Sequence, residues 1–123
     1  MLKNLVLIID DDNRNIFALK AVLKAKGFEC ISAGSAREGF ELVDKHENVA
    51  IILMDMMMPD MDGYQAIAAM KKSEKLRDIP VLAVTAQAMV GDRERCLNAG
   101  ASGYVSKPIN VDELIVQIEK FTK

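Results

Sequence analysis

The chain has 123 residues and a mass of 13.6 kDa, which is the size of one ordinary domain. Half of the residues are apolar and 28% are charged. This balance excludes a disordered chain and favours a globule that folds without a metal or disulfide staple. The formal net charge of −2 excludes the broad basic surface of a nucleic-acid-binding module. No apolar run approaches the roughly 20 residues of a membrane span.

Five short apolar runs, rich in Val, Ile and Leu, predict five strands. In chain order they are Leu5 to Ile9, Phe28 to Ala33, Val49 to Met54, Pro80 to Val84, and Gly103 to Val105. Three of the runs are nearly continuous rather than alternating, which is typical of strands buried on both faces of a parallel sheet.

Helical patterns follow every strand. In chain order they are an Ile16, Leu19, Leu23 spacing that stops at Gly27, a segment behind the Ser35 and Glu38 capping box, Gly63 to Lys72, a polar segment from Asp92 to Asn98 closed by Gly100, and a stripe of Val111, Leu114, Ile115 and Ile118 behind Asn110 and Glu113. Each interval is long enough for the crossover that parallel strands require. We therefore predict one α/β domain over residues 1–123: a flavodoxin-like, doubly wound parallel sheet of order 2-1-3-4-5, with five helices in three layers.

The two cysteines predict free thiols. Cys30 and Cys96 are too few for a disulfide framework and lack metal-ligand spacing. Free cysteines are usually buried, so we expect two buried thiols in a reducing compartment. The first residues run directly into an apolar segment and show no signal peptide. These features predict a cytoplasmic protein.

Polar residues stand where four of the predicted strands end. They are Asp10, Asp11 and Asp12 after the first strand, Asp55 after the third, Thr85 after the fourth, and Ser106, Lys107 and Pro108 after the fifth. In a doubly wound sheet the functional site lies at the carboxyl ends of the strands, beside the point where the strand order reverses. We therefore expect these residues to converge on one rim of the sheet.

Three carboxylates at that rim, Asp10, Asp11 and Asp55, predict a cation site. Two carboxylates about 4 Å apart repel each other by about 4 kcal/mol at an effective dielectric constant of 20. A hard divalent ion, Mg²⁺ or Mn²⁺, would remove this conflict through oxygen ligands and leave positions open for phosphate. With Lys107 and Thr85 added, the set suits phosphoryl transfer, and an aspartyl phosphate is the expected covalent species.

Four motifs carry a resemblance that spans essentially the whole chain. They are Ile8 to Asp12, Leu53 to Gly63, Ala83 to Ala86, and Tyr104 to Pro108. In this order and spacing they resemble the response regulator receiver domain of two-component signalling. The Asn13-Arg14-Asn15 segment and the residues around Gly91 are most similar to single-domain regulators and to the receiver modules of hybrid sensor kinases.

The resemblance implies a role for each residue of the acidic rim. Asp55 is the phosphoryl acceptor, Asp11 binds Mg²⁺ directly, and Asp10 assists through water. The backbone carbonyl of Met57 is a further metal ligand, so the Met57 side chain need not be polar.

The resemblance also implies the phosphoryl contacts and the switch. Thr85 and the Ala86 amide contact the phosphoryl oxygens, and Lys107 pairs with the phosphate. The Lys107–Pro108 peptide is expected to be cis, which an X-Pro bond permits at low cost. Tyr104 is the rotameric aromatic of the switch, the alternative being a half-buried strand aromatic with no such role.

The implied partners are proteins. The phosphoryl donor is a histidine kinase or a histidine phosphotransfer protein, and the output partner binds the face of the fourth helix, fifth strand and fifth helix, with Met89 and Val90 in its contact patch. No direct contact with nucleic acid or membrane is expected. A phosphorylation-dependent homodimer stays open. The protein is not expected to be an enzyme beyond its own phosphorylation and dephosphorylation. We expect Met57 and Gln87 to make its self-dephosphorylation slower than in receivers with a polar residue at the Met57 position and an acid at the Gln87 position.

Other functions fit the residues less well. A phosphatase of the haloacid dehalogenase type also has an Asp nucleophile and Mg²⁺, but it needs a second acid where Met57 stands. A flavodoxin-like electron carrier needs a phosphate loop where Asp11, Asp12 and Asn13 would repel the cofactor. The neighbouring Met56 to Met58 run is expected to pack rather than bind a soft metal, and His46 is expected to lie on the surface. The sequence leaves open whether the domain stands alone or belongs to a hybrid sensor kinase or a longer regulator, and it does not identify the pathway.

Overall fold

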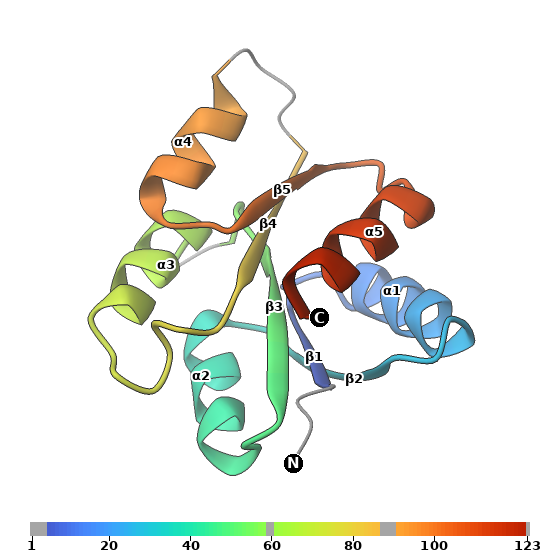
Figure 1. Cartoon of the computed structure of the whole chain (residues 1–123), viewed down its shortest axis with the longest axis horizontal. Helices are drawn as coiled ribbons and strands as arrows, with labels where there is room; N and C mark the ends of the chain where they lie inside the picture. The colour runs from blue at the N-terminus through green and yellow to red at the C-terminus, as the bar shows by residue number, and fades with distance from the viewer. Residues whose placement is uncertain (1–4, 59–60, 87–90, 123) are drawn as a thin grey trace.

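The computed structural model describes residues 5–58, 61–86 and 91–122, and within them strands and helices alternate along the chain (Figure 1). The strands are β1 Leu5–Ile9, β2 Glu29–Ala33, β3 Val49–Asp55, β4 Val81–Thr85 and β5 Gly103–Ser106. The helices are α1 Asn13–Ala25, α2 Ala36–Lys45, α3 Gly63–Lys71, α4 Asp92–Ala99 and α5 Val111–Thr122. The sheet is parallel throughout, in the order β2-β1-β3-β4-β5. The predicted fold class and strand order are confirmed.

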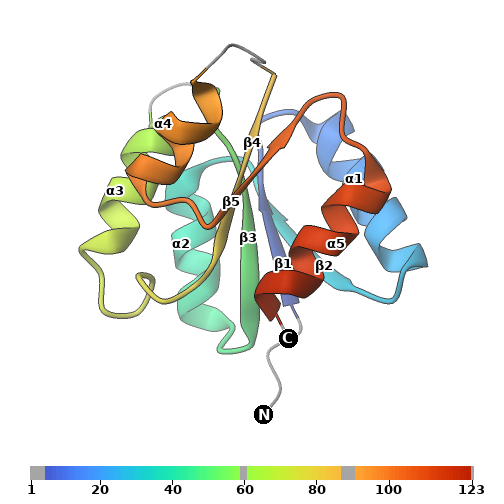
Figure 2. The same ribbon diagram turned by 45° about the horizontal axis from the view of Figure 1, so that its top comes forward.

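The helices cover the sheet on both faces. Figure 2 shows α2, α3 and α4 on one side of the sheet and α1 and α5 on the other. Two apolar cores follow from this arrangement. Ile9, Met54 and Ile67 belong to the core under α2, α3 and α4, whereas Leu23 and Ile118 belong to the core under α1 and α5. Because both faces are covered, every residue of the three central strands is buried, as the continuous apolar runs predicted.

One extra residue in β3 sets the register of the central strands. Leu5 pairs with Val49 but Val6 pairs with Ile51, so Ala50 forms an irregularity between them. From there the pairing runs without a break to Ile9 opposite Met54. The next residue on each strand is an aspartate. This register therefore makes Asp10 and Asp55 neighbours at the carboxyl edge of the sheet.

Two strands begin later than their apolar runs suggested. The Phe28 N–H donates to the Leu23 carbonyl at 3.0 Å and so closes the end of α1 instead of entering β2. Pro80 has no N–H to donate to the ladder, and β4 begins after it. Cys96 is buried as expected, but Cys30 is only half-buried because β2 is an edge strand. In the described ranges no helix has the length and apolar character to cross a membrane.

Candidate functional site

Three carboxylates meet at the carboxyl edge of the sheet. Asp10 follows β1, Asp55 ends β3, and Asp11 lies in the loop that leads to α1. One carboxylate oxygen from each residue lies within 4.8 Å of the other two. Asp10 and Asp55 are each only 3% exposed, while Asp11 is exposed. The structure thus brings together the three acids that the sequence predicted for a cation site.

Asp10 is held in place by its own loop and by α1. The Asp12 N–H donates to Asp10 Oδ1 at 2.8 Å, and Asn15 Nδ2 donates to Asp10 Oδ2 at 3.5 Å. Asp12 is also the N-cap of α1, where its side chain accepts from the Arg14 N–H. Within the described ranges, no hydrogen bond engages the Asp11 carboxylate. Asp11 is therefore the acid with its oxygens open to a ligand.

Asp55 is buried beside a second acid. The Met57 N–H donates to Asp55 Oδ1 at 3.0 Å. Burial, opposed by this hydrogen bond and by the Lys107 charge but reinforced by the Asp10 charge, raises the pKa of Asp55 from 3.8 to about 6. The charged form of Asp55 is therefore costly without a further cation.

Lys107 directly follows β5 and lies near both buried acids. Its ammonium nitrogen lies 3.9 Å from Asp10 Oδ2 and 3.9 Å from Asp55 Oδ1. The Lys107 N–H donates to the Thr85 carbonyl at 2.8 Å, which ties this position to the end of β4. The Lys107–Pro108 peptide is cis, as predicted.

The other predicted site residues lie at the neighbouring strand ends. Thr85 is buried at the end of β4, and Ala86 is exposed immediately after it. Met57, in the loop after β3, is 54% exposed. Tyr104 is partly buried on β5 and packs against the core under α2, α3 and α4. The residues expected to govern the phosphoryl lifetime and the output patch, Gln87, Met89 and Val90, lie outside the described residues.

The cluster fits a hard divalent cation. It combines three carboxylates from two strand ends, and Lys107 brings an ammonium group within 3.9 Å of two of them. Oxygen donors of this kind suit Mg²⁺ or Mn²⁺, which bind through a few carboxylates and keep positions for water and phosphate. The elevated pKa of Asp55 is consistent with this, because burial first and the Asp10 charge second favour protonation, and a bound cation would oppose both.

An apolar groove beside the cluster was not foreseen from the sequence. It has a volume of about 280 Å³ and lies between α1 and the start of α5, reaching Asp10 and Lys107. Its apolar lining consists of Ala18, Leu19, Val22, Pro108, Ile109 and Val111. Elsewhere on α1, Phe17 is 76% exposed. The signal for the groove was available in part, since the apolar Ala18 and Val22 lie outside the Ile16, Leu19, Leu23 spacing of α1.

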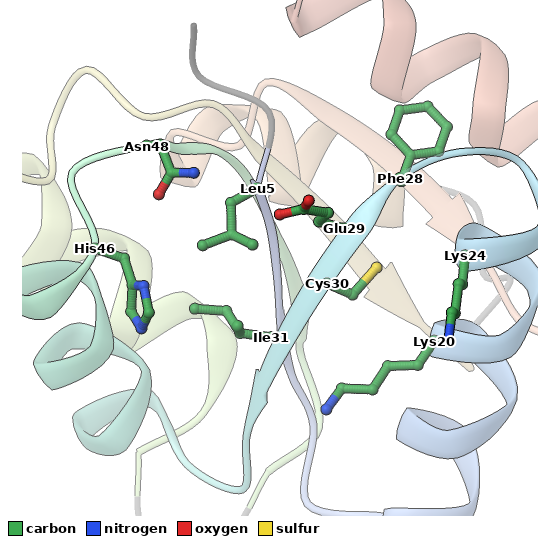
Figure 3. A pocket seen from close by; sticks show the side chains of 9 residues that line it. All are labelled: Leu5, Lys20, Lys24, Phe28, Glu29, Cys30, Ile31, His46 and Asn48. Atoms are coloured by element: carbon green, nitrogen blue, oxygen red, sulfur yellow. The ribbon is translucent and has the colours of Figure 1, made fainter. Parts of the chain in front are cut away.

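A second hollow lies at the opposite end of the sheet. Figure 3 shows it at the edge strand β2, with Lys20 and Lys24 reaching from α1, Cys30 and Ile31 on the strand, and His46 at the end of α2. Its volume is about 480 Å³. It contains none of the three clustered carboxylates, so the larger hollow is not the acidic site.

Comparisons with known proteins agree with this geometry. The sequence matches the family profile described as "Response regulator receiver domain" over residues 6–119. It is 38% identical over 116 residues to the polar-differentiation response regulator DivK of Brucella ovis, and the alignment covers 94% of each chain. The DivK protein of Brucella anthropi is 36% identical over the same length.

Solved structures show the same fold. A putative response regulator from Chloroflexus aurantiacus has a TM-score of 0.89 at 27% identity, with 97% of each chain covered. The signal receiver domain of a signal transduction histidine kinase from Syntrophus aciditrophicus has a TM-score of 0.86 at 27% identity, covering 97% of this chain and 89% of that one. The chain is therefore similar both to a response regulator and to the receiver domain of a histidine kinase, the two settings that the sequence left open.

Proposed function

The chain belongs to the response regulator receiver domain family, and we propose that Asp55 is the residue that accepts its phosphoryl group. As a receiver domain it is phosphorylated on an aspartate in two-component signalling and is a signalling protein, not a classical enzyme. The observation that carries the assignment is the position of Asp55. Of the three clustered acids, Asp55 and Asp10 lie 3.9 Å from the Lys107 ammonium. The choice between these two depends on which carboxylate has an oxygen to offer.

Asp10 is less suited to be the acceptor, because its two oxygens are already used. Both accept hydrogen bonds from the loop and from α1. Asp55 lies at the end of β3, the central strand of the sheet, between the strands that carry Asp10 and Thr85. A phosphoryl group on Asp55 therefore has Asp10 and Asp11 on one side and the end of β4 on the other.

We propose that Asp11 and Asp55 hold Mg²⁺ or Mn²⁺ directly, with the Met57 carbonyl as a further ligand and Asp10 acting through water. The open carboxylate of Asp11 and the engaged carboxylate of Asp10 support this division. When bound, the cation supplies charge neutralisation for the phosphoryl oxygens.

The transfer is a substitution at phosphorus. An Asp55 carboxylate oxygen forms the new P–O bond, the P–N bond of the donor phosphohistidine breaks, and its electron pair returns to the imidazole nitrogen. Lys107 can neutralise charge on the transferred group, since its ammonium already lies beside Asp55. Thr85 and the Ala86 amide, at the end of β4, are placed to receive the remaining phosphoryl oxygens.

We propose that the donor, a histidine kinase or histidine phosphotransfer protein, docks over the groove between α1 and α5. The donor must bring its phosphohistidine to Asp55, and this groove opens beside Asp10 and Lys107. Phe17, elsewhere on the surface of α1, is 76% exposed and offers further apolar surface on this helix. A partner that covers the groove would bury apolar area and exclude water from the site.

The output surface is proposed to be the face of α4, β5 and α5. Tyr104 on β5 pairs with Ala83 on β4, the strand that ends at Thr85, so a change at Thr85 can reach it through neighbouring strands. We further propose that residues 1–123 form one receiver domain, supported by the single five-stranded sheet. A cytoplasmic location is supported by the two free cysteines.

Intact-mass spectrometry after incubation with acetyl phosphate and Mg²⁺ tests the acceptor. The wild-type chain should gain one phosphoryl group, and Asp55→Asn should gain none. Asp78→Asn, which alters an exposed acid outside the cluster, is the matched control and should gain one. Full phosphorylation of Asp55→Asn would refute the assignment.

A further inference from the structure

A cluster of polar and aromatic side chains joins α3 to α4, away from the three carboxylates. The Tyr64 hydroxyl oxygen lies 3.7 Å from Cys96 Sγ, and the Arg95 guanidinium carbon lies 4.9 Å from the centre of the Tyr64 ring. Arg95 Nη1 also lies 3.9 Å from Asp92 Oδ1. We call Tyr64, Asp92, Arg95 and Cys96 the α3–α4 cluster.

The α3–α4 cluster includes both buried residues of α4. The only buried residues of this helix, all of which is described, are Asp92 and Cys96, and one of them is a carboxylate. The helix begins at Gly91, which has a φ of 94° and provides no side-chain cap. A helix with so little buried hydrocarbon has low local stability. The contacts that Arg95 and Cys96 make to Tyr64 therefore contribute to holding it, beside its packing on β5.

On the α3 side, the cluster is tied to the backbone that directly follows Asp55. The Gly63 N–H donates to the Met56 carbonyl at 3.4 Å, and a Cβ on Gly63 would lie 2.7 Å from Met56 Cα. Tyr64 is the next residue, and Met56 directly follows Asp55. The cluster thus links a segment packed tightly beside Asp55 to a helix that is weakly held.

The α4 side of the cluster reaches Tyr104. Burial, and then the charges of Asp92 and Cys96, raise the pKa of the Tyr104 hydroxyl. Burial, and then the contact with Cys96, raise the pKa of Tyr64. Tyr64 and Tyr104 both pack against the core that contains Cys96. The cluster therefore lies between the backbone that follows Asp55 and the proposed output face.

We infer that the α3–α4 cluster holds α4 in its unphosphorylated position and thereby opposes the phosphorylated conformation. This inference rests on the proposed function, because it requires Asp55 to be the acceptor and α4 to move. A contact made in only one of two conformations stabilises that one alone. Weakening the cluster must then lower the cost of reaching the other conformation and tighten the binding of any ligand that selects it.

Arg95→Gln is the variant that tests this, because it removes both the ring contact and the ion pair of one side chain that is 64% exposed. The probe is beryllofluoride with Mg²⁺, titrated into the full chain by calorimetry. We expect Arg95→Gln to bind beryllofluoride about three- to tenfold more tightly than wild type. Arg93→Gln, the same charge change at an exposed position on the same helix, should bind as wild type does.

Tyrosine emission provides a second readout. The chain has two tyrosines and no tryptophan, and both Tyr64 and Tyr104 lie in or beside the cluster. Beryllofluoride should therefore change the emission of wild type, and Arg95→Gln without ligand should already show part of this change. Arg95→Lys, which keeps the charge but loses the planar stacking surface, should give an intermediate affinity.

The outcomes separate this inference from the proposed function. If wild type does not bind beryllofluoride, the proposed function fails and the inference fails with it. If wild type binds and Arg95→Gln binds equally or more weakly, the inference alone is overturned. A cluster that only stabilises the fold would lower the unfolding free energy of Arg95→Gln without tightening ligand binding, and that result also overturns it.

Discussion

Lys107 Nζ lies 3.9 Å from Asp55 Oδ1 and equally far from Asp10 Oδ2, so one cation serves two buried carboxylates. The Lys107 charge lowers the pKa of Asp55 but does not offset burial and the Asp10 charge, which together raise it to about 6. Neither distance is a short ion pair. The ammonium can therefore approach a transferred phosphoryl group without first leaving a tight partner.

Replacing this ammonium should slow phosphorylation. Lys107→Met removes the charge that would neutralise the transferred group, and hydrogen bonds to charged groups contribute about 1.5–3 kcal/mol. We expect the rate of phosphoryl incorporation from acetyl phosphate to fall roughly tenfold to a hundredfold. Mass spectrometry against time measures the rate, with exposed Lys72→Met on the C-terminal side of α3 as the control. An unchanged rate would show that Lys107 does not act on the transferred group.

The three acids should differ in their effect on metal binding. Asp11→Asn and Asp55→Asn should weaken Mn²⁺ binding more than Asp10→Asn does, since inner-shell oxygens contribute more than groups that act through water. The free ion can be followed by electron paramagnetic resonance. Asp12→Asn is the control, because Asn caps a helix as well as Asp does and Asp12 lies outside the cluster. Equal weakening by Asp10→Asn and Asp11→Asn would contradict this order.

Charge on Asp55 should destabilise the metal-free domain. Its folded-state pKa of about 6 exceeds its ordinary value of 3.8. The stabilisation from protonating Asp55 is therefore complete below about pH 4 and is lost as the pH rises through about 6. Allowing for solvent screening, we expect Asp55→Asn to raise the free energy of unfolding by about 1–2 kcal/mol at pH 7.5 in EDTA.

The gain from Asp55→Asn should shrink as the pH falls toward 4, where wild-type Asp55 is itself neutral. Urea unfolding at pH 7.5, 6 and 4.5 measures this trend. Glu41→Gln, at an exposed position in α2, provides a control with the same charge change. A gain that is independent of pH would show that the Asp55 charge is not its cause.

Phe17 should matter only for a protein donor. Phe17→Ser removes a ring that is 76% exposed, so the fold has little to lose. We expect transfer from a histidine kinase to slow about tenfold or more, in line with the loss of an aromatic anchor at an interface. Phosphorylation by acetyl phosphate should not change. Val116→Ser, at the other strongly exposed apolar position on a helix, is the control, and equal loss in both variants would argue against docking at α1.

The lifetime of the phosphoryl group should depend on Met57. Its side chain is 54% exposed beside Asp55, where it places apolar bulk over the approach of water and offers only a weak sulfur acceptor. Met57→Asn should therefore release phosphate several-fold faster, because aligning a nucleophile can be worth several kcal/mol. Phosphate release from Met57→Asn and Met57→Leu can be compared with wild type. No acceleration in Met57→Asn would mean that this side chain does not limit water access.

The sequence alone determined the elements and the rim at which the chemistry lies. Continuous apolar runs are explained only by strands buried on both faces, and the alternation of strands with helices leaves parallel crossovers as the solution. Asp10, Asp55, Thr85 and Lys107 each stand at a strand end, and parallel strands bring their carboxyl ends to one edge. These statements depend on local patterns, which the chain carries in its order of residues.

The tertiary structure alone decided which of these groups are neighbours and how each is held. The extra residue Ala50 sets the β1–β3 register that pairs Ile9 with Met54 and so aligns Asp10 with Asp55. The contact of the Tyr64 hydroxyl with Cys96 and that of Arg95 with the Tyr64 ring join residues whose partners no local pattern identifies. Register and side-chain contacts depend on how layers pack against one another, and packing is a property of the whole chain rather than of any segment.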